Sequence, residues 1–229
     1  MNVVLVHGAW VDGSIWSGVI AVLQSHDHHV TAVQLPLTSL EDDVAVTSRA
    51  LADQDGPTVL VGHSYGGSVI TAAGAIPNVT ALVYIAAYAP DVGESGANLN
   101  ARYPLAPGAA AIQSRTDGYL WVDQTQYQDA LAHDVDHQEA AILAATQKPV
   151  RPAIFYDPTP VAAWKTKRSW YQISSADHMI PSQLQIWLAT RIEAETLTLP
   201  ASHLPMVSHP AEIAELIERA AAAGATQSL

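Results

Sequence analysis

Hydrophobic residues along the chain fall into short continuous runs, separated by segments in which they recur every three or four positions. Six of the runs are rich in β-branched residues and are apolar throughout, which is typical of strands covered on both faces. These predicted strands are residues 3–6, 30–33, 58–61, 81–85, 170–173 and 196–199. Strands that alternate with helices predict an α/β fold, in which a mostly parallel sheet of about six strands carries helices on both faces.

The segments between the runs show apolar stripes at helical spacing. The clearest stripes are Ile15, Val19, Ile20 and Leu23; Leu184, Trp187, Leu188 and Arg191; and Ile213, Leu216 and Ile217. Pro181 and Pro210 stand where the last two of these helices would begin, a position at which a missing N–H costs nothing. We therefore expect helices after the first, fifth and sixth strands.

One long segment interrupts this alternation. Residues 88–160 contain no clear core strand, and proline and glycine are frequent as far as Gly118, with a helical stretch near residues 124–147. A connection of this length without a sheet strand is too long for a simple loop. We predict a single-domain chain in which residues 1–87 and 161–229 form the core and residues 88–160 form an inserted lid.

Composition narrows the classes of partner. The 229 residues include 10 Lys and Arg against 22 Asp and Glu, and the resulting net charge of −12 disfavours nucleic acids and anionic membranes as partners. The chain has no cysteine, which excludes disulfides and thiol nucleophiles. The first apolar run is too short for a signal peptide, and no stretch approaches the ~20 apolar residues of a membrane span, so we expect a cytoplasmic protein.

The strongest chemical signal is a serine in a tight turn. The sequence G-H-S-Y-G at positions 62–66 directly follows the predicted strand 58–61 and opens a helix. A strand, a sharp turn and a helix form the context that a nucleophile elbow requires, and Gly62 and Gly66 supply flanking positions without side chains. Ser64 would lie at a helix N-terminus, whose free N–H groups favour negative charge on a reacting oxygen.

A serine hydroxyl needs a base to take its proton and a carboxylate to orient that base. Both should lie in loops that leave later strands at the same edge of the sheet. The loop after the fifth predicted strand contains Asp177, and the loop after the sixth contains His203. The order Ser64, Asp177, His203 matches the chain order Ser, Asp, His of this arrangement.

Other residues compete for the roles of base and acid. His209 is an alternative base, although its place just before a predicted helix is more typical of a cap. Asp91, after the fourth predicted strand, is an alternative acid. His178 follows Asp177 directly and is interpreted as a loop residue, His63 as a side chain packed beneath the sheet edge, and Asp157 as part of a turn.

An oxyanion hole needs two backbone donors. We expect the first from Tyr65, the residue after the serine. The second should come from the loop after the first strand, where Gly8 permits a close approach and Ala9 N–H is our choice. Trp10 and Trp121 are candidate walls of a substrate pocket.

No pattern in the sequence calls for a metal or a cofactor. His133 and His137 stand four residues apart on a predicted lid helix, a spacing that can bind a metal. Asp134 and Asp136 fall off that face and no third ligand is evident, so we interpret the segment as a solvated acidic helix. The glycines of residues 62–67 are not followed by the lysine of a phosphate-binding loop.

Four motifs together resemble the α/β-hydrolase fold superfamily. They are V-L-V-H-G-A-W at positions 4–10, V-G-H-S-Y-G-G at 61–67, D-H-M-I-P at 177–181 and S-H-L-P at 202–205. Within that superfamily the chain is most similar to the compact group of plant methylesterases, hydroxynitrile lyases and small bacterial esterases. The resemblance implies the same nucleophile, acid, base and oxyanion donors, which are Ser64, Asp177, His203, Ala9 and Tyr65.

Two positions depart from the hydroxynitrile lyases of that group. Those enzymes carry a threonine after the first-strand histidine and a lysine after the catalytic histidine, where this chain has Gly8 and Leu204. Because the lysine supports cyanide handling, its absence argues against cyanogenic lyase chemistry.

These features predict a cofactor-free serine hydrolase that cleaves a small, mostly apolar carboxylic ester through an acyl-enzyme on Ser64. Fold does not fix chemistry, so two alternatives stay open. One is a lyase, a cyclase or a carbon–carbon bond hydrolase on the same scaffold, and the other is a hydrolase-like ligand-binding receptor. The sequence also leaves a homodimer open.

Overall fold

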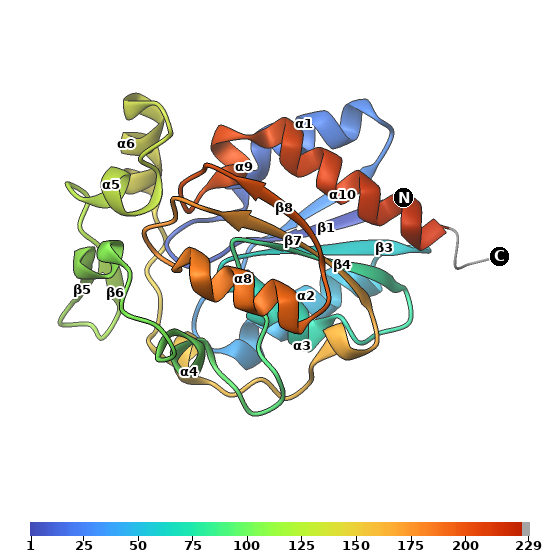
Figure 1. Cartoon of the computed structure of the whole chain (residues 1–229), viewed down its shortest axis with the longest axis horizontal. Coiled ribbons are helices and arrows are strands. Elements are labelled where there is room, and N and C mark those ends of the chain that lie inside the picture. Colours follow the sequence, from blue (N-terminus) through green and yellow to red (C-terminus); the bar gives the residue numbers. More distant parts are fainter. Residues whose placement is uncertain (226–229) are drawn as a thin grey trace.

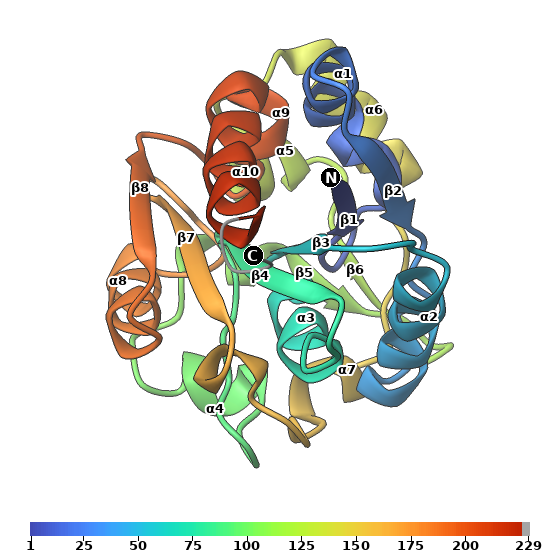
Figure 2. The ribbon, with the colours of Figure 1, turned by 90° about the vertical axis from the view of Figure 1, so that its right-hand side faces the viewer.

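Six parallel strands form the central sheet of the computed structural model, which describes residues 1–225 (Figures 1 and 2). They are β1 (Asn2–Val6), β2 (His29–Val33), β3 (Thr58–His63), β4 (Val79–Ile85), β7 (Arg168–Ser174) and β8 (Glu195–Leu199), in the spatial order β2-β1-β3-β4-β7-β8. Each strand contains one of the six predicted runs. The prediction of a six-stranded parallel α/β fold is therefore confirmed.

Helices cover both faces of this sheet (Figure 2). On one face α1 (Ser17–Ser25), preceded by the 3-10 helix η1 (Gly13–Trp16), packs against α10 (Pro210–Ala225), with α9 (Pro205–Ser208) beside them. The other face carries α2 (Leu40–Ala52), α3 (Gly66–Ala73) and α8 (Ser182–Arg191). In residues 1–225 no helix is both long and apolar enough to cross a bilayer.

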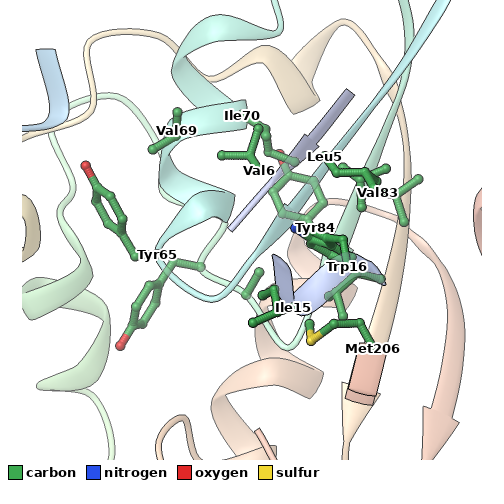
Figure 3. Packing of buried hydrophobic residues seen from close by; sticks show 14 of the residues in the cluster. Leu5, Val6, Ile15, Trp16, Tyr65, Val69, Ile70, Val83, Tyr84 and Met206 are labelled. Atoms are coloured by element: carbon green, nitrogen blue, oxygen red, sulfur yellow. The ribbon is translucent and has the colours of Figure 1, made fainter. Parts of the chain in front are cut away.

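The core fills the space between the sheet and these two helical layers. Every residue of β3 and all but one residue of β1 and of β4 are buried, which explains why these sequences are apolar on both faces. Figure 3 shows side chains of this core, among them Val69 and Ile70 of α3 and, from other elements, Trp16 and Met206. Burial on this scale fixes the frame from which the loops project.

The segment between β4 and β7, described over its whole length, adds no strand to the central sheet. It holds α4 (Gly96–Asn100), η2 (Pro107–Ala111), β5 (Ile112–Ser114), β6 (Leu120–Val122), α5 (Tyr127–Leu131), α6 (His137–Thr146), α7 (Ala153–Tyr156) and η3 (Ala163–Lys165). The predicted helical stretch is two helices with a turn between them. The antiparallel pair β5–β6 was not predicted, because three-residue strands leave no readable alternation. Helices α5 and α6 lie to one side of the sheet, with β5 and β6 (Figure 1).

A very tight turn joins β3 to α3 at Ser64, whose φ of 54° lies in the left-handed region. The glycines beside it are needed because backbone crosses here at close range. A Cβ on Gly62 would lie 2.5 Å from the carbonyl oxygen of Gly66, and one on Gly66 would lie 2.7 Å from the carbonyl oxygens of Val6 and His7. The strained conformation is therefore held by packing on both sides, as in a nucleophile elbow.

A buried carboxylate fastens α2 to this turn. Asp43 is fully buried, and its oxygens accept hydrogen bonds from the Tyr65 hydroxyl at 2.7 Å and from the backbone N–H of Leu37 at 2.9 Å. Burial raises the pKa of Asp43 to about 6, although both hydrogen bonds favour the charged form. Asp43 thus anchors the residue that follows the serine.

Replacing Gly62 by alanine should cost at least about 2 kcal/mol of unfolding free energy, because the new methyl group meets backbone that cannot yield. Gly96→Ala is the matched control, since its nearest contact is an ordinary 3.5 Å from the Tyr88 ring. We expect Gly96→Ala to change stability by less than about 1 kcal/mol. Urea titrations of both variants measure the difference, and equal stabilities would contradict this view of the turn.

The stability of the wild type should fall relative to Asp43→Asn as the pH rises. The folded state holds the Asp43 proton up to a pKa of about 6, whereas the ordinary value is 3.8, so the folded state binds more protons between these values. From pH 4 to pH 7.5 the wild type should lose about 2.4 kcal/mol relative to the variant. Denaturant titrations across this range give the difference, and a constant difference would refute the assignment.

Candidate active site

The structure brings Ser64, His203 and Asp177 together at one edge of the sheet. Ser64 lies in the turn after β3, Asp177 in the loop after β7 and His203 in the loop after β8. His203 Nε2 lies 2.8 Å from Ser64 Oγ, and His203 Nδ1 lies 2.8 Å from Asp177 Oδ2. Because an ionised carboxylate only accepts, Nδ1–H donates to Asp177 and Nε2 is free to accept the serine proton.

Four donors hold the Asp177 carboxylate. Its Oδ1 accepts from the backbone N–H groups of Met179 at 2.7 Å and Ile180 at 3.0 Å. Its Oδ2 accepts from His203 and, at 2.8 Å, from the side-chain amide of Gln185. This loop carries the D-H-M-I-P motif, so the residues that follow the carboxylate fold back to bind it.

The loop that carries His203 is held from two sides. The ring of His63 lies 4.8 Å from the ring of His203, and its Nε2–H donates to the backbone carbonyl of His203 at 2.8 Å. From the inserted segment, the Asp134 carboxylate accepts the N–H of Ser202 at 3.0 Å. Burial lowers the pKa of His63 well below its usual value, so the ring stays neutral beside the pair.

The loop after β1 packs directly against the serine turn. A Cβ on Gly8 would lie 2.7 Å from the Cβ of Ser64, which explains the glycine. Burial lowers the pKa of His7 to about 4, so this ring is neutral, accepts the N–H of Leu35 at 3.0 Å and donates to the carbonyl of Gly8 at 2.8 Å.

The two amides expected to form the oxyanion hole are those of Ala9 and Tyr65. Within residues 1–225 neither Ala9 N–H nor Tyr65 N–H has a hydrogen-bond acceptor. Trp10, next to Ala9, adopts a φ of 59°, which bends the loop sharply at this point. Both amides therefore stay available to a ligand oxygen.

The alternative base and acid residues have other partners. Asp91 forms an ion pair with Lys165, and Asp157 accepts the backbone N–H of Leu40. The remaining alternative residues also contact other groups: His209 Nδ1 lies 3.6 Å from Glu212, and His178 bonds to the carbonyl of Asp129. None of these side chains is hydrogen-bonded to Ser64 in the described part of the chain.

A cavity of about 430 Å³ opens beside Ser64 and His203. Its walls are mostly apolar and come largely from the inserted segment, which supplies Leu105, Ala109, Leu120, Phe155 and Tyr156. Trp10 also lines the cavity, and its indole N–H donates to the carbonyl of Leu120 at 3.2 Å. The sequence did not reveal the lining residues of the segment, because they follow no periodic pattern.

Trp121 does not line this cavity, so its prediction as a pocket wall was wrong. Successive side chains of a strand point to opposite faces, and in β6 the neighbouring Leu120 faces the cavity. The ring of Trp121 instead lies beneath the guanidinium of Arg115, 3.9 Å from the ring centroid.

The prediction of His133 and His137 on one helix was also wrong. The Asp136 carboxylate accepts the N–H groups of Gln138 and Glu139 and caps α6, so that helix begins at His137 and leaves His133 in the preceding turn. The ring of His133 packs against the ring of His178 at 4.5 Å. Residues 1–225 contain no cluster of three side chains suited to a metal ion.

Comparison with known proteins finds relatives with hydrolase and esterase names. Probable hydrolase R7 from Phoma sp. is 26% identical over 94% of this chain and 96% of its own. Methylesterase 7 from Arabidopsis thaliana is 35% identical over 38% of each chain. The crystal structure of a pyrethroid hydrolase from Sphingobium faniae superposes with a TM-score of 0.84 at 23% identity, and the match covers 99% of both chains.

The family model described as the alpha/beta hydrolase family matches residues 3–216, nearly the whole chain. This match confirms the resemblance that the four motifs indicated, and the relatives with hydrolase and esterase names agree with it. The chain is an enzyme that belongs to the alpha/beta hydrolase family.

Proposed function

We propose that this enzyme is a serine hydrolase that cleaves small, mostly apolar carboxylic esters through an acyl-enzyme on Ser64. One observation carries the proposal: Ser64 Oγ is hydrogen-bonded to His203, whose other ring nitrogen is bonded to Asp177, at the wall of an apolar cavity. The esterase relatives support ester bonds as the target.

In the first half of the reaction, Ser64 Oγ attacks the ester carbonyl while His203 Nε2 takes its proton. Asp177 accepts the Nδ1–H throughout, so the imidazole keeps its orientation and its positive charge is stabilised. When the carbon–oxygen bond to the alcohol breaks, His203 returns the proton to the leaving oxygen. An acyl group then remains on Ser64.

The negative charge that develops on the carbonyl oxygen needs donors already in place. Ala9 N–H and Tyr65 N–H serve this role in the proposal, and neither has a competing acceptor within residues 1–225. Two hydrogen bonds restrain the residues around them: His7 to the carbonyl of Gly8, and the Tyr65 hydroxyl to Asp43.

In the second half, a water molecule gives one proton to His203 Nε2 and attacks the acyl carbon. The ester bond to Ser64 breaks, Ser64 recovers its proton from His203, and a carboxylic acid leaves. All protons are accounted for by the imidazole, so these steps call for no further acid or base.

The cavity supports an uncharged, apolar substrate. Its lining is dominated by aliphatic and aromatic side chains from the segment 88–160, which we propose acts as a lid. At the same cavity, Leu105 is 81% exposed and Tyr156 is 69% exposed. Burying these side chains against an apolar group of the substrate would stabilise the complex.

Ser64→Ala should abolish turnover of p-nitrophenyl esters, with kcat reduced by about 10⁴-fold or more, because within residues 1–225 Ser64 supplies the only hydroxyl that is hydrogen-bonded to His203 Nε2. Steady-state rates, together with mass spectrometry of the acid-quenched wild type, test both the loss and the acyl adduct on Ser64. A variant that keeps its activity would refute the nucleophile. Turnover of the natural substrate without an adduct would instead favour lyase or cyclase chemistry, and ligand retention without turnover a receptor.

A bulkier side chain in the cavity wall should shorten the acyl chain that the enzyme prefers. Ala109→Leu adds bulk inside the cavity, whereas Ala110→Leu changes the exposed neighbour in η2 and is the matched control. Across p-nitrophenyl acetate to octanoate, we expect Ala109→Leu to lower kcat/KM for octanoate about tenfold relative to acetate. Identical chain-length profiles for both variants would show that the acyl group binds elsewhere.

A further inference from the structure

A buried glutamine contacts the acid of the site. Gln185 in α8 has no exposed surface, and its Nε2 donates to Asp177 Oδ2 at 2.8 Å and to the carbonyl of Ile180 at 2.9 Å. Its Oε1 accepts the backbone N–H of Ser174 at 2.9 Å. Both amide protons and the amide oxygen are therefore engaged.

These partners fix which way the amide points. With the amide reversed, Gln185 Oε1 would face two acceptors, Asp177 Oδ2 and the carbonyl of Ile180. The NH₂ group would then face the N–H of Ser174. Only one orientation satisfies all three partners, so an N–H is directed at the carboxylate.

The oxygen that Gln185 binds is the one that His203 uses. Asp177 Oδ2 accepts both the Gln185 amide and His203 Nδ1–H, each at 2.8 Å. A donor on this oxygen stabilises its negative charge and so weakens its pull on the imidazole proton. The same bond also tethers the oxygen that faces the ring.

We propose that Gln185 is a positioning residue that sets the basicity of His203 through Asp177. This inference rests on the triad of the proposed function, but not on the identity of the ester. Gln185 does not reach the reacting atoms. It acts by drawing charge away from the oxygen that orients the base.

Several titratable groups surround the Asp177–His203 pair. They are His63 from β3, Tyr88 after β4, Tyr171 from β7, His178 in the Asp177 loop and Asp134 from the inserted segment. Burial raises the pKa of both tyrosines and lowers that of His63, so these three stay neutral. Within residues 1–225, His203 and Gln185 are the only side chains that donate to the Asp177 carboxylate.

The test uses the pH dependence of Ser64 labelling by a fluorophosphonate, which needs a neutral His203 but no ester turnover. Gln185→Met removes the donor at similar volume. We expect the acidic limb of the labelling rate to move upward by about 0.5–1 pH unit. The maximal rate should fall about tenfold as the carboxylate loses a tether.

Gln183→Met is the matched control, because Gln183 stands two residues earlier in α8 with an exposed side chain. Its labelling profile should overlay that of the wild type. An acidic limb that moves by less than about 0.2 unit in folded Gln185→Met would overturn the proposal, even if the rate falls. A loss of rate alone is what a merely structural side chain would give.

Gln185→Met also leaves the N–H of Ser174 without its acceptor. Gln185→Glu provides a second variant that keeps this acceptor. Its new carboxyl must retain a proton beside Asp177, because two adjacent carboxylates cannot both ionise, and its O–H replaces the amide donor. Because a donor to Asp177 is restored, we expect the acidic limb of Gln185→Glu to lie near that of the wild type. A limb displaced as far as that of Gln185→Met would overturn the proposal.

The labelling readout separates this inference from the proposed function. If the limb shifts as expected while the wild type hydrolyses no ester, Gln185 still tunes the base and only the ester chemistry fails. If Ser64 reacts with neither esters nor the fluorophosphonate, both proposals fail.

Discussion

Close backbone packing around Ser64 controls how the loops of the site are arranged. The serine holds a left-handed conformation that only its surroundings can enforce. A Cβ on Gly67 would lie 2.1 Å from the carbonyl oxygen of Tyr88, and one on Gly8 would meet Ser64 itself. The loops after β1 and β4 therefore press against the turn after β3. The strand order β1-β3-β4 at the centre of the sheet is what brings these loops together.

Burial then decides the electrostatics of the site. His7 and His63 lie near the triad, yet desolvation keeps both rings neutral. They therefore form hydrogen bonds that hold the backbone and add no charge to the site. Charge is concentrated instead on Asp177, where four donors compensate its removal from water. A carboxylate held in this way keeps the orientation that a triad needs to stabilise an imidazolium.

The core and the segment between β4 and β7 contribute different features to the site. The sheet and its loops supply the groups suited to chemistry, whereas the segment between β4 and β7 supplies most of the cavity wall. The two parts are also joined by hydrogen bonds, since Asp134 of the segment binds the backbone next to His203 and the Ser208 hydroxyl. The segment can therefore vary in its apolar side chains while this contact supports the base.

Strand hydrophobicity and the glycines of a tight turn are local requirements, so they predicted the sheet and the edge at which Ser64, Asp177 and His203 meet. The sequence by itself did not determine the β5–β6 hairpin, the true start of α6 or the face on which Trp121 lies. These depend on cross-strand pairing and on caps that short segments do not encode. Gln185 was equally hidden: as one polar residue on an apolar helix face it has no pattern. Only the tertiary structure, by packing α8 against β7, brings its amide to the carboxylate of Asp177.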